Sequence, residues 1–366
     1  MTDHRTPRAP SPRAPSRHRL AAVAGVLLLA ATAACSTVGA SGNDAGESGG
    51  GTVVLVTHDS FAVSQRLLAA FEEESGVTVE VRQPGDAGTL VNQLVLTKDS
   101  PLGDAVYGVD NSFAGRALDA GILEPYAAPG ADDVVAGLAV DDTDRLTPVD
   151  FSDVCINVDW TWFAEHDLAE PATLEDLADP AYRDLLVVTD PATSSPGLAF
   201  LLATVGAYGD EWTDYWTRLR DNGVAVADSW SDAYYVDFSG GEGAGPRPLV
   251  LSYASSPPFT VPKGGDEPTT RALLDTCFRQ VEYTGVLAGA ENPEGARELV
   301  DFLLSEPFQR AIPESMYVYP AVEGTPLPTA WERFAPLADH PYPVSPADID
   351  ANREEWIREW TATVVD

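Results

Sequence analysis

The sequence predicts an α/β protein made of two lobes. Apolar runs with strand character alternate with segments of helical periodicity along most of the chain, a pattern typical of α/β folds with mostly parallel sheets. The part expected to fold begins at Thr52 and is about 310 residues long, which exceeds the usual size of a single hydrophobic core. Two lobes are therefore expected.

The first alternating unit opens the folded part. Residues 52–57 (TVVLVT) are β-branched and almost continuously apolar, as in a strand buried on both faces. Residues 60–75 carry apolar side chains at helical spacing, and Gly76 is typical of a helix C-terminus. Residues 77–82 (VTVEVR) alternate between apolar and polar side chains, so a second strand is expected there.

Further elements follow in the same manner. Strands are expected at 104–109, 146–150, 152–158, 185–189, 224–227, 249–253 and 278–287, and helices at 89–98, 174–177, 197–208, 212–222, 293–305 and 349–364. Extended crossovers between the lobes are expected near 146–150 and 283–287. We therefore assign residues 52–148 and 286–366 to the first lobe, and 149–285 to the second.

The N-terminus has the composition of an export signal. Five arginines precede an uncharged apolar run at residues 20–34, which is too short to span a bilayer as a permanent helix. Small residues lead into Cys35, so residues 1–35 resemble a bacterial lipoprotein signal, with Thr32 where such signals usually carry leucine. The alternative is an ordinary secretory signal with an incidental cysteine. Residues 36–51, rich in Gly, Ser and Ala, are expected to form a flexible linker.

Export and charge restrict the partners. Either kind of signal places the protein outside the cytoplasm, and a lipid on Cys35 would anchor it to the outer face of the cell membrane. The chain has a formal net charge of −35. This charge argues against nucleic acid and anionic membrane surfaces as partners, and it mildly favours cationic ligands.

Two cysteines occur beyond the signal, Cys155 and Cys277. Outside the cytoplasm such a pair is most simply a disulfide, and both residues lie in apolar runs of strand character. Two buried free thiols are the alternative. The sequence contains no C-x-x-C pair and no Cys/His cluster, so a metal site is not expected.

Polar and aromatic turns follow several of the predicted strands. In open α/β sheets, ligands bind beyond the carboxyl ends of the strands. The turns are HDSF at 58–61, DNS at 110–112, DPATSSPG at 190–197, WSDAYY at 230–235 and YASSP at 253–257, with YVYP at 317–320 in an extended stretch after a helix.

These turns resemble those of the thiamine-binding members of the type II periplasmic-binding-protein family. The runs HDSF, YGVDNSF, TDPATSSPGLAFLL, WSDAYY, LVLSYASSP and MYVYP occur in the family's order over nearly the whole chain after the signal. The related iron, sulfate and polyamine binders share the fold without this set of runs. The resemblance implies capture of thiamine, or its mono- or diphosphate, by closure of a cleft. It further implies delivery to the membrane permease of an ABC transporter by a monomer that has no cofactor and no catalytic activity.

The resemblance also indicates the ligand contacts. The expected contacts are Asp59, Ser60, Asp110, Asn111, Thr193, Ser194, Ser195, Trp230, Tyr234, Tyr253, Ser256 and Tyr317. Tyr253 and Tyr317 are expected to stack on the ligand rings, because a flat cation binds well to aromatic faces. Asp59 and Asp110 are candidates for the positive charge or the aminopyrimidine. Similar proteins usually carry Trp where Tyr317 stands and Tyr where His58 stands.

A phosphate ester would need an anion site of its own. Residues 193–195 precede an apolar helix whose Pro196 suits the first turn, and the free N–H groups of such a helix start can bind phosphate. Trp230 and Tyr234 could close over the tail of the ligand. Without the resemblance, the same turns would be interpreted as ordinary helix caps and core aromatics.

Two other functions remain open at the level of sequence. The adjacent Tyr234 and Tyr235, with His58, could bind ferric ion as related proteins of this fold do, because phenolate is a hard oxygen ligand. A secreted hydrolase is the second alternative, although no G-x-S-x-G and no H-E-x-x-H motif occurs.

Overall fold

A computed structural model of the chain describes residues 50–241 and 243–365. The described residues form one compact unit. The predicted signal at 1–35, its Cys35 and nearly all of the 36–51 linker lie outside the described residues. At the end of that linker, Gly51 already belongs to the first strand. In the described part of the chain, no helix is long and apolar enough to cross a membrane.

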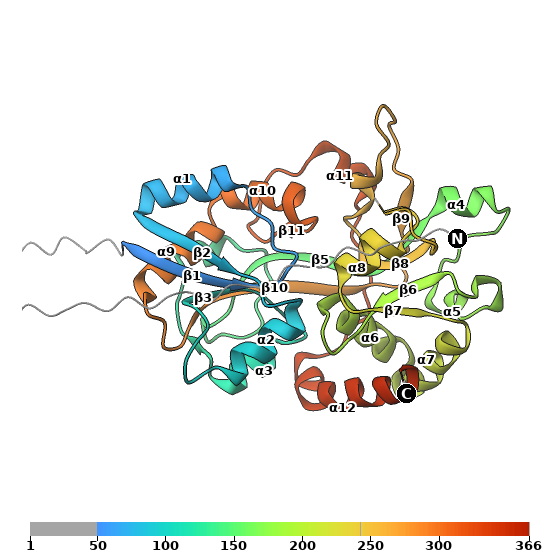
Figure 1. Cartoon of the computed structure of the whole chain (residues 1–366), viewed down its shortest axis with the longest axis horizontal. Helices are drawn as coiled ribbons and strands as arrows, with labels where there is room; N and C mark the ends of the chain where they lie inside the picture. Colours follow the sequence, from blue (N-terminus) through green and yellow to red (C-terminus); the bar gives the residue numbers. More distant parts are fainter. Residues whose placement is uncertain (1–49, 242, 366) are drawn as a thin grey trace, which may run out of the picture. The chain divides into compact units, whose positions relative to one another are not determined.

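A mixed sheet runs through the molecule (Figure 1). Its strands follow the order β2-β1-β3-β10-β5-β8-β6-β7 within the described residues. Their bounds are β1 Gly51–Thr57, β2 Val77–Arg82, β3 Ala105–Asp110, β5 Thr147–Asp159, β6 Leu186–Thr189, β7 Ala225–Ala227, β8 Leu249–Tyr253 and β10 Phe278–Leu287. Three short strands flank this path: β4 Leu123–Glu124 pairs with β10, whereas β9 Thr270–Ala272 and β11 Tyr319–Pro320 pair with β5.

The two ends of the sheet are parallel and its centre is antiparallel. β1 pairs in parallel with β2 and β3 at one end, and β6 pairs in parallel with β7 and β8 at the other. The long strands β5 and β10 pair antiparallel with each other between these groups. Their register shifts between Glu282 and Tyr283. We refer below to the β1–β3 side and the β6–β8 side as the two halves of the molecule.

The sequence predicted two separate extended segments where β5 forms. The structure instead has one strand, because Phe151 continues the buried run between them and packs against Tyr319 with the ring centroids 5.6 Å apart. Every residue of β5 is buried. A fully buried strand next to β10 needs no break at that position.

Helices of the first half cover the β1–β3 end of the sheet (Figure 1). They are α1 Gln65–Ser75, α2 Ala87–Leu96, α3 Ala114–Ala120, α9 Pro293–Leu303 and α10 Glu306–Met316. Ser64 caps α1 by accepting a hydrogen bond from the N–H of Leu67, and Gly76 ends it with a φ of 73°. The helix therefore begins later than the predicted 60–75, and Phe61 is free to pack on Tyr107 with centroids 4.9 Å apart.

The second half is built around an apolar helix. The helices here are α4 Trp160–Glu165, α5 Leu174–Leu177, α6 Ser195–Tyr208, α7 Trp212–Asp221, α8 Trp230–Asp232, α11 Thr329–Phe334 and α12 Pro346–Val364. α6 is buried along most of its length, so it carries apolar residues on all sides. The C-terminal α12 packs on α7 through Trp216 and Trp360, and Arg353 of α12 lies over Phe113 beside α3. α12 thus contacts both halves.

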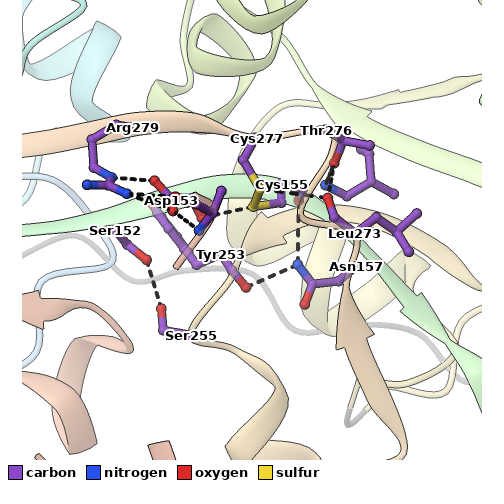
Figure 2. Close-up of a disulfide and its surroundings, with 12 residues drawn as sticks. Ser152, Asp153, Cys155, Asn157, Tyr253, Ser255, Leu273, Thr276, Cys277 and Arg279 are labelled. Atoms are coloured by element: carbon purple, nitrogen blue, oxygen red, sulfur yellow. Dashed lines mark hydrogen bonds and ion pairs between the residues drawn. A yellow bond between two sulfur atoms is a disulfide. The ribbon is translucent and has the colours of Figure 1, made fainter. Parts of the chain in front are cut away.

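A disulfide joins the two central strands at one end (Figure 2). Cys155 on β5 is bonded to Cys277, the residue before β10, and both side chains are fully buried. The predicted disulfide is confirmed, and the alternative of two free thiols is wrong. Close by, the guanidinium of Arg279 on β10 forms an ion pair with Asp153 on β5. A covalent bond and an ion pair, two residues apart along each strand, therefore hold β5 and β10 together.

Candidate functional site

A cavity of about 230 Å³ lies beyond the carboxyl ends of β1 and β8. Segments from both halves line it. The lining residues are His58, Asp59, Ser60, Phe61, Ala62, Trp230, Ser231, Tyr235, Tyr253, Glu282, Ser315, Met316, Tyr317 and Val318. This is the place where open α/β sheets bind ligands, because strand ends and their turns converge there.

One wall of the cavity is aromatic. Trp230, Tyr253 and Tyr317 approach one another, with centroids 6.2 Å apart for Trp230 and Tyr253 and 6.3 Å apart for Trp230 and Tyr317. The indole N–H of Trp230 donates to Ser252 Oγ at 3.0 Å, which orients the ring. Rings held in this way offer faces to a flat ligand and attract positive charge.

Two predicted contacts support this wall from behind. Tyr234 is buried and stacks on Trp230 with centroids 4.9 Å apart. Ser256 Oγ lies 2.9 Å from Ser252 Oγ, the group that accepts from the indole. Neither Tyr234 nor Ser256 lines the cavity. In the structure they position Trp230.

Tyr317 adopts a backbone conformation that tyrosine rarely takes. It follows α10 with a φ of 63°, which costs a non-glycine residue about 1 kcal/mol or more. Its carbonyl oxygen accepts a hydrogen bond from Ser255 Oγ, and Phe259 packs on its ring with centroids 3.9 Å apart. These contacts from the other half hold the phenol at the cavity.

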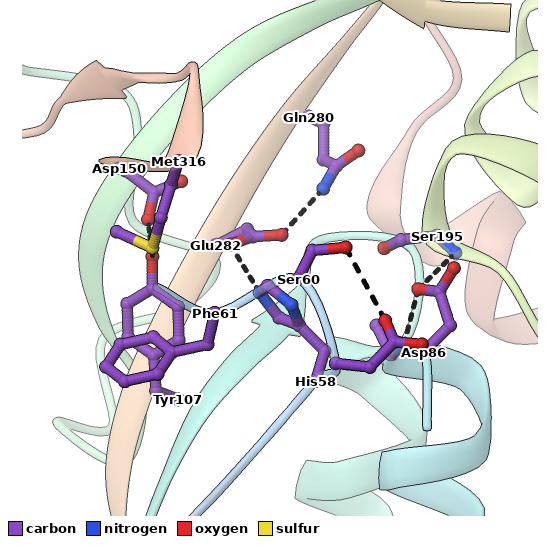
Figure 3. A network of polar contacts seen from close by, with 12 residues as sticks. His58, Ser60, Phe61, Asp86, Tyr107, Asp150, Ser195, Gln280, Glu282 and Met316 are labelled. Carbon is purple, nitrogen blue, oxygen red and sulfur yellow. Dashed lines mark hydrogen bonds and ion pairs between the residues drawn. The ribbon is translucent and has the colours of Figure 1, made fainter. Parts of the chain in front are cut away.

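An ion pair forms the polar side of the cavity (Figure 3). His58 Nε2 lies 3.3 Å from Glu282 Oε2, and both side chains are buried. Gln280 donates to the other Glu282 oxygen at 3.0 Å. Burial alone would lower the pKa of His58, but attraction to Glu282 and the hydrogen bond between them, with Asp86 and Asp150, raise it to about 9.

Two further buried acids, Asp86 and Asp150, lie near this pair. Tyr107 on β3 donates its hydroxyl to the buried Asp150 of β5. Burial raises the pKa of Asp150, and the negative charge of Glu282 adds to the increase. Burial likewise raises the pKa of Asp86. A positively charged ligand would relieve the repulsion among these acids, whereas an anion would add to it.

The structure brings five of the predicted contacts to the cavity: Asp59, Ser60, Trp230, Tyr253 and Tyr317. The others lie elsewhere. Asp110 is fully buried and accepts hydrogen bonds from the N–H groups of Ser112 and Phe113, at 2.7 and 3.1 Å. Asn111 bonds to the backbone of β10, at Arg279 O and Val281 N.

The predicted anion site lies at the junction of the two halves. Thr193 Oγ1 donates to the carbonyl of Asp228 at 3.1 Å, and Ser194 and Ser195 begin α6. Asp86 from the other half faces this helix start: its Oδ1 accepts from Ala87 N at 2.6 Å and from Ser195 N at 3.4 Å. One carboxylate thus lies at the N-termini of both α2 and α6, where the helix dipoles favour negative charge.

Glu282 is the charged residue of the cavity that sequence reasoning missed. It lies inside a run that was interpreted only as a strand and a crossover. An acid within a long apolar strand is itself a signal, because a buried carboxylate needs a partner. The partner, His58, was considered only as a possible iron ligand and as a departure from similar proteins.

Of the two tyrosines considered for iron, Tyr235 lines the cavity, whereas Tyr234 is packed behind it. Burial raises the pKa of Tyr234, which disfavours the phenolate form that binds ferric ion. The ring of Tyr234 is instead packed between Trp230 and Phe238. Over the described residues, no group of three or more His, Cys, Asp or Glu side chains is placed to hold a metal ion.

Comparison with known proteins shows which proteins this chain resembles. A family model described as a bacterial extracellular solute-binding protein matches residues 100–255. The thiamine-binding periplasmic protein of Brucella suis is 30% identical over 327 residues, covering 85% of this chain and 91% of the relative. The protein of the same name from Escherichia coli K12 is 29% identical over 318 residues, covering 85% of this chain and 93% of the relative.

Solved structures show the same fold. A periplasmic thiamin binding protein superimposes with a TM-score of 0.76 at 27% identity, covering 86% of this chain and 96% of the other. Iron-bound HitA of Pseudomonas aeruginosa has a TM-score of 0.66 at 22% identity, covering 84% of this chain and 99% of the other, a likeness in fold alone. The predicted type II periplasmic-binding-protein fold is confirmed. The chain belongs to the family of periplasmic thiamine-binding proteins among the bacterial extracellular solute-binding proteins.

Proposed function

We propose that this protein binds thiamine in the cavity between its two halves and delivers it to the permease of an ABC transporter. The observation that carries the proposal is the pairing of an aromatic wall with a buried carboxylate, Glu282, in one small cavity. Thiamine has two flat rings and a permanent positive charge on the thiazolium. Aromatic faces and carboxylates are the groups that bind such a cation.

Each side of the cavity has a role in this proposal. Tyr253, Tyr317 and Trp230 pack on the ligand rings, and Asp59 and Glu282 face its positive charge or the aminopyrimidine. Residues 52–148 and 286–366 form one lobe and 149–285 the other, although α11 and α12 of the first lobe pack mainly on elements of the second half. Contacts from both lobes favour the closed state. The protein is a monomeric carrier with no cofactor and no catalytic step.

The proposal extends to location and to phosphate esters. A lipid on Cys35 would hold the protein at the outer face of the cell membrane. Thiamine mono- and diphosphate are included as ligands, with the start of α6 as the anion site. Since the Asp86 carboxylate lies at that helix start, an ester would have to displace it. We therefore expect the esters to bind more weakly than thiamine.

Isothermal titration tests the proposal. The mature protein is titrated with thiamine, thiamine diphosphate and ferric citrate. We expect one-to-one binding of thiamine, weakened by Tyr253→Ala through a loss of about 2 kcal/mol, or roughly thirtyfold. Tyr126→Ala is the matched control, because Tyr126 contacts Asp301 outside the cavity. Binding of iron without thiamine would contradict the proposal, as would an unchanged affinity in Tyr253→Ala.

A further inference from the structure

His58 is held in a geometry that leaves its ring little freedom. It follows β1, and its ring lies against Gly108 of β3. A Cβ on Gly108 would lie 2.1 Å from His58 Cδ2, and Gly108 has a φ of 92°. The chain therefore uses the one residue type that leaves room for the imidazole at this position. The ring is thereby kept with Nε2 3.3 Å from Glu282 Oε2 (Figure 3).

Acidic groups face this imidazole from several elements. Glu282 comes from β10, Asp150 from β5, and Asp86 precedes α2. The Tyr107 ring from β3 lies 5.7 Å away between centroids, and Asp59 is the next residue along the chain. Gln280, Asp110 and Tyr253 lie around Glu282, the partner of His58, and carry no positive charge. The neutral amide of Gln83 donates to the carbonyl oxygen of His58 at 3.1 Å. Among the described residues that line the cavity, His58 is the one basic side chain.

We propose that His58 is a specificity-determining residue that couples capture of a cation to release of a proton. In the empty cavity the imidazolium of His58 neutralises Glu282. A ligand with a fixed positive charge takes over that role, and the proton on His58 leaves to solvent. The charges balance, because one cation enters the cavity and one proton departs. The inference rests on the proposed function, since it takes thiamine as the cation.

Electrostatics supports this exchange. With a pKa of about 9, His58 is largely protonated at pH 8 in the empty protein. A second positive charge in the same buried cavity disfavours the imidazolium and lowers its pKa. Asp110, whose pKa burial raises to about 7, is mostly ionised at pH 8 and contributes little there. Burial also raises the pKa values of Asp150 and Asp86, so these acids can release protons when a cation enters. The part of the proton release that is lost in His58→Gln is therefore the part that reports on His58.

The coupling makes affinity depend on pH in a defined direction. A ligand that expels one proton binds more tightly as the pH rises toward the pKa of the empty site, by up to about tenfold per pH unit. Acidification works against capture. A neutral ring compound of similar shape replaces no charge at Glu282, and its binding releases no proton from His58.

Titration calorimetry in two buffers tests the inference. Thiamine is titrated into the mature protein at pH 8 in HEPES and in Tris, whose ionisation enthalpies differ. The difference in heat gives the number of protons released. We expect the wild type to release about one proton more than His58→Gln does. His166→Gln is the matched control, because His166 stacks on Trp162 with centroids 3.7 Å apart and does not line the cavity.

The outcomes separate the inference from the function on which it rests. Absence of thiamine binding by the wild type overturns both. Thiamine binding with equal proton release in the wild type and His58→Gln overturns the inference alone. Melting curves show first that the variants are folded, and His58→Asn, a shorter neutral side chain, provides a second variant. In either neutral variant, the affinity should change less between pH 7.5 and 8.5 than in the wild type.

Discussion

At the scale of single residues, Glu282 belongs to the central sheet and also lines the cavity. The residue belongs to β10, the long strand next to β5, and its carboxylate meets both His58 and Gln280. A charge carried on such a strand is positioned by the sheet itself. It therefore needs no loop to hold it in place before the ligand arrives.

The first prediction concerns the charge on that side chain. Glu282→Gln keeps the shape and the bond from Gln280 but removes the negative charge that faces the cavity. We expect thiamine to bind about thirtyfold more weakly, since a hydrogen bond to a charged group is worth about 2 kcal/mol. Calorimetry measures the change, with Glu294→Gln as the control, because the side chain of Glu294 on α9 is exposed. An affinity equal to that of the wild type would show that the charge of Glu282 does not contribute to thiamine binding.

The second prediction concerns Asp110, whose pKa burial raises to about 7. The folded-state pKa lies above the ordinary value, so the stability that the protonated form provides is present at pH 4 and is lost as the pH rises through 7. The loss is on the order of 4 kcal/mol in free energy of unfolding. The substitution Asp110→Asn removes this pH-dependent loss, because an amide does not titrate. The amide oxygen can still accept the hydrogen bonds from the N–H groups of Ser112 and Phe113.

Urea unfolding at pH 5 and pH 8 tests this second prediction. Between the two pH values, the wild type should lose more stability than Asp110→Asn does. The other buried acids are the same in both proteins, so the difference between them isolates Asp110. Parallel pH profiles would show that this carboxyl titrates as it does in the unfolded chain.

At the scale of elements, the two halves meet where α2 and α6 begin. Gly88 in the first turn of α2 allows this approach, because a Cβ there would lie 2.9 Å from the carbonyl oxygen of Ala192. The same Cβ would also lie 2.9 Å from Phe113 Cζ. Asp86, at the same junction, provides the negative charge for both helix starts.

The third prediction is that Gly88→Val forces these helix starts apart. Overpacking of this kind costs about 1–3 kcal/mol. The obstructed atoms include backbone of the other half, so we expect a lower melting temperature and weaker thiamine binding together. Gly50→Ala is the control, since its Cβ would meet only Gly76 O at 3.7 Å. A variant with unchanged affinity would show that ligand binding does not need this contact.

The predictable part of the fold follows from local pattern. The strands at 52–57 and 77–82 were expected from β-branched and alternating runs, and the structure confirms them as β1 and β2. The pairing of His58 with Glu282 could not be predicted in the same way. These residues lie 224 positions apart and meet only through the register of β10 against β3.

Local pattern also explains why several expected contacts lie outside the cavity. Asp110 ends β3, as a ligand-binding acid would, but the same position suits an acid that binds the next backbone N–H groups. The sequence does not distinguish the two. Trp230 and Tyr234 were both expected at the ligand. The two rings stack on each other, so that Trp230 lines the cavity and Tyr234 lies behind Trp230.

At the scale of the whole molecule, the cavity is built from chain segments that lie far apart. Asp59 follows β1, Tyr253 ends β8, and Tyr317 follows α10. A ligand that contacts all three bridges the two halves. Such a ligand stabilises the arrangement in which the halves are close, and its affinity contains the difference in free energy between open and closed states.

The fourth prediction is that thiamine closes and stabilises the protein. Ligand at one hundred times the dissociation constant adds about 2.7 kcal/mol to the free energy of unfolding. For a folded unit of about 320 residues this corresponds to a rise of about 4 °C in melting temperature. Small-angle scattering should show a smaller radius of gyration with thiamine than without it.

Gly88→Val separates stabilisation from closure in the same experiment. Because its bulk lies between the helix starts of the two halves, the variant can gain stability from thiamine only through contacts that do not need full closure. We expect a smaller rise in melting temperature and little change in radius of gyration. Equal compaction of the variant and the wild type would place the moving parts elsewhere than at the junction of α2 and α6, and would contradict closure at that junction.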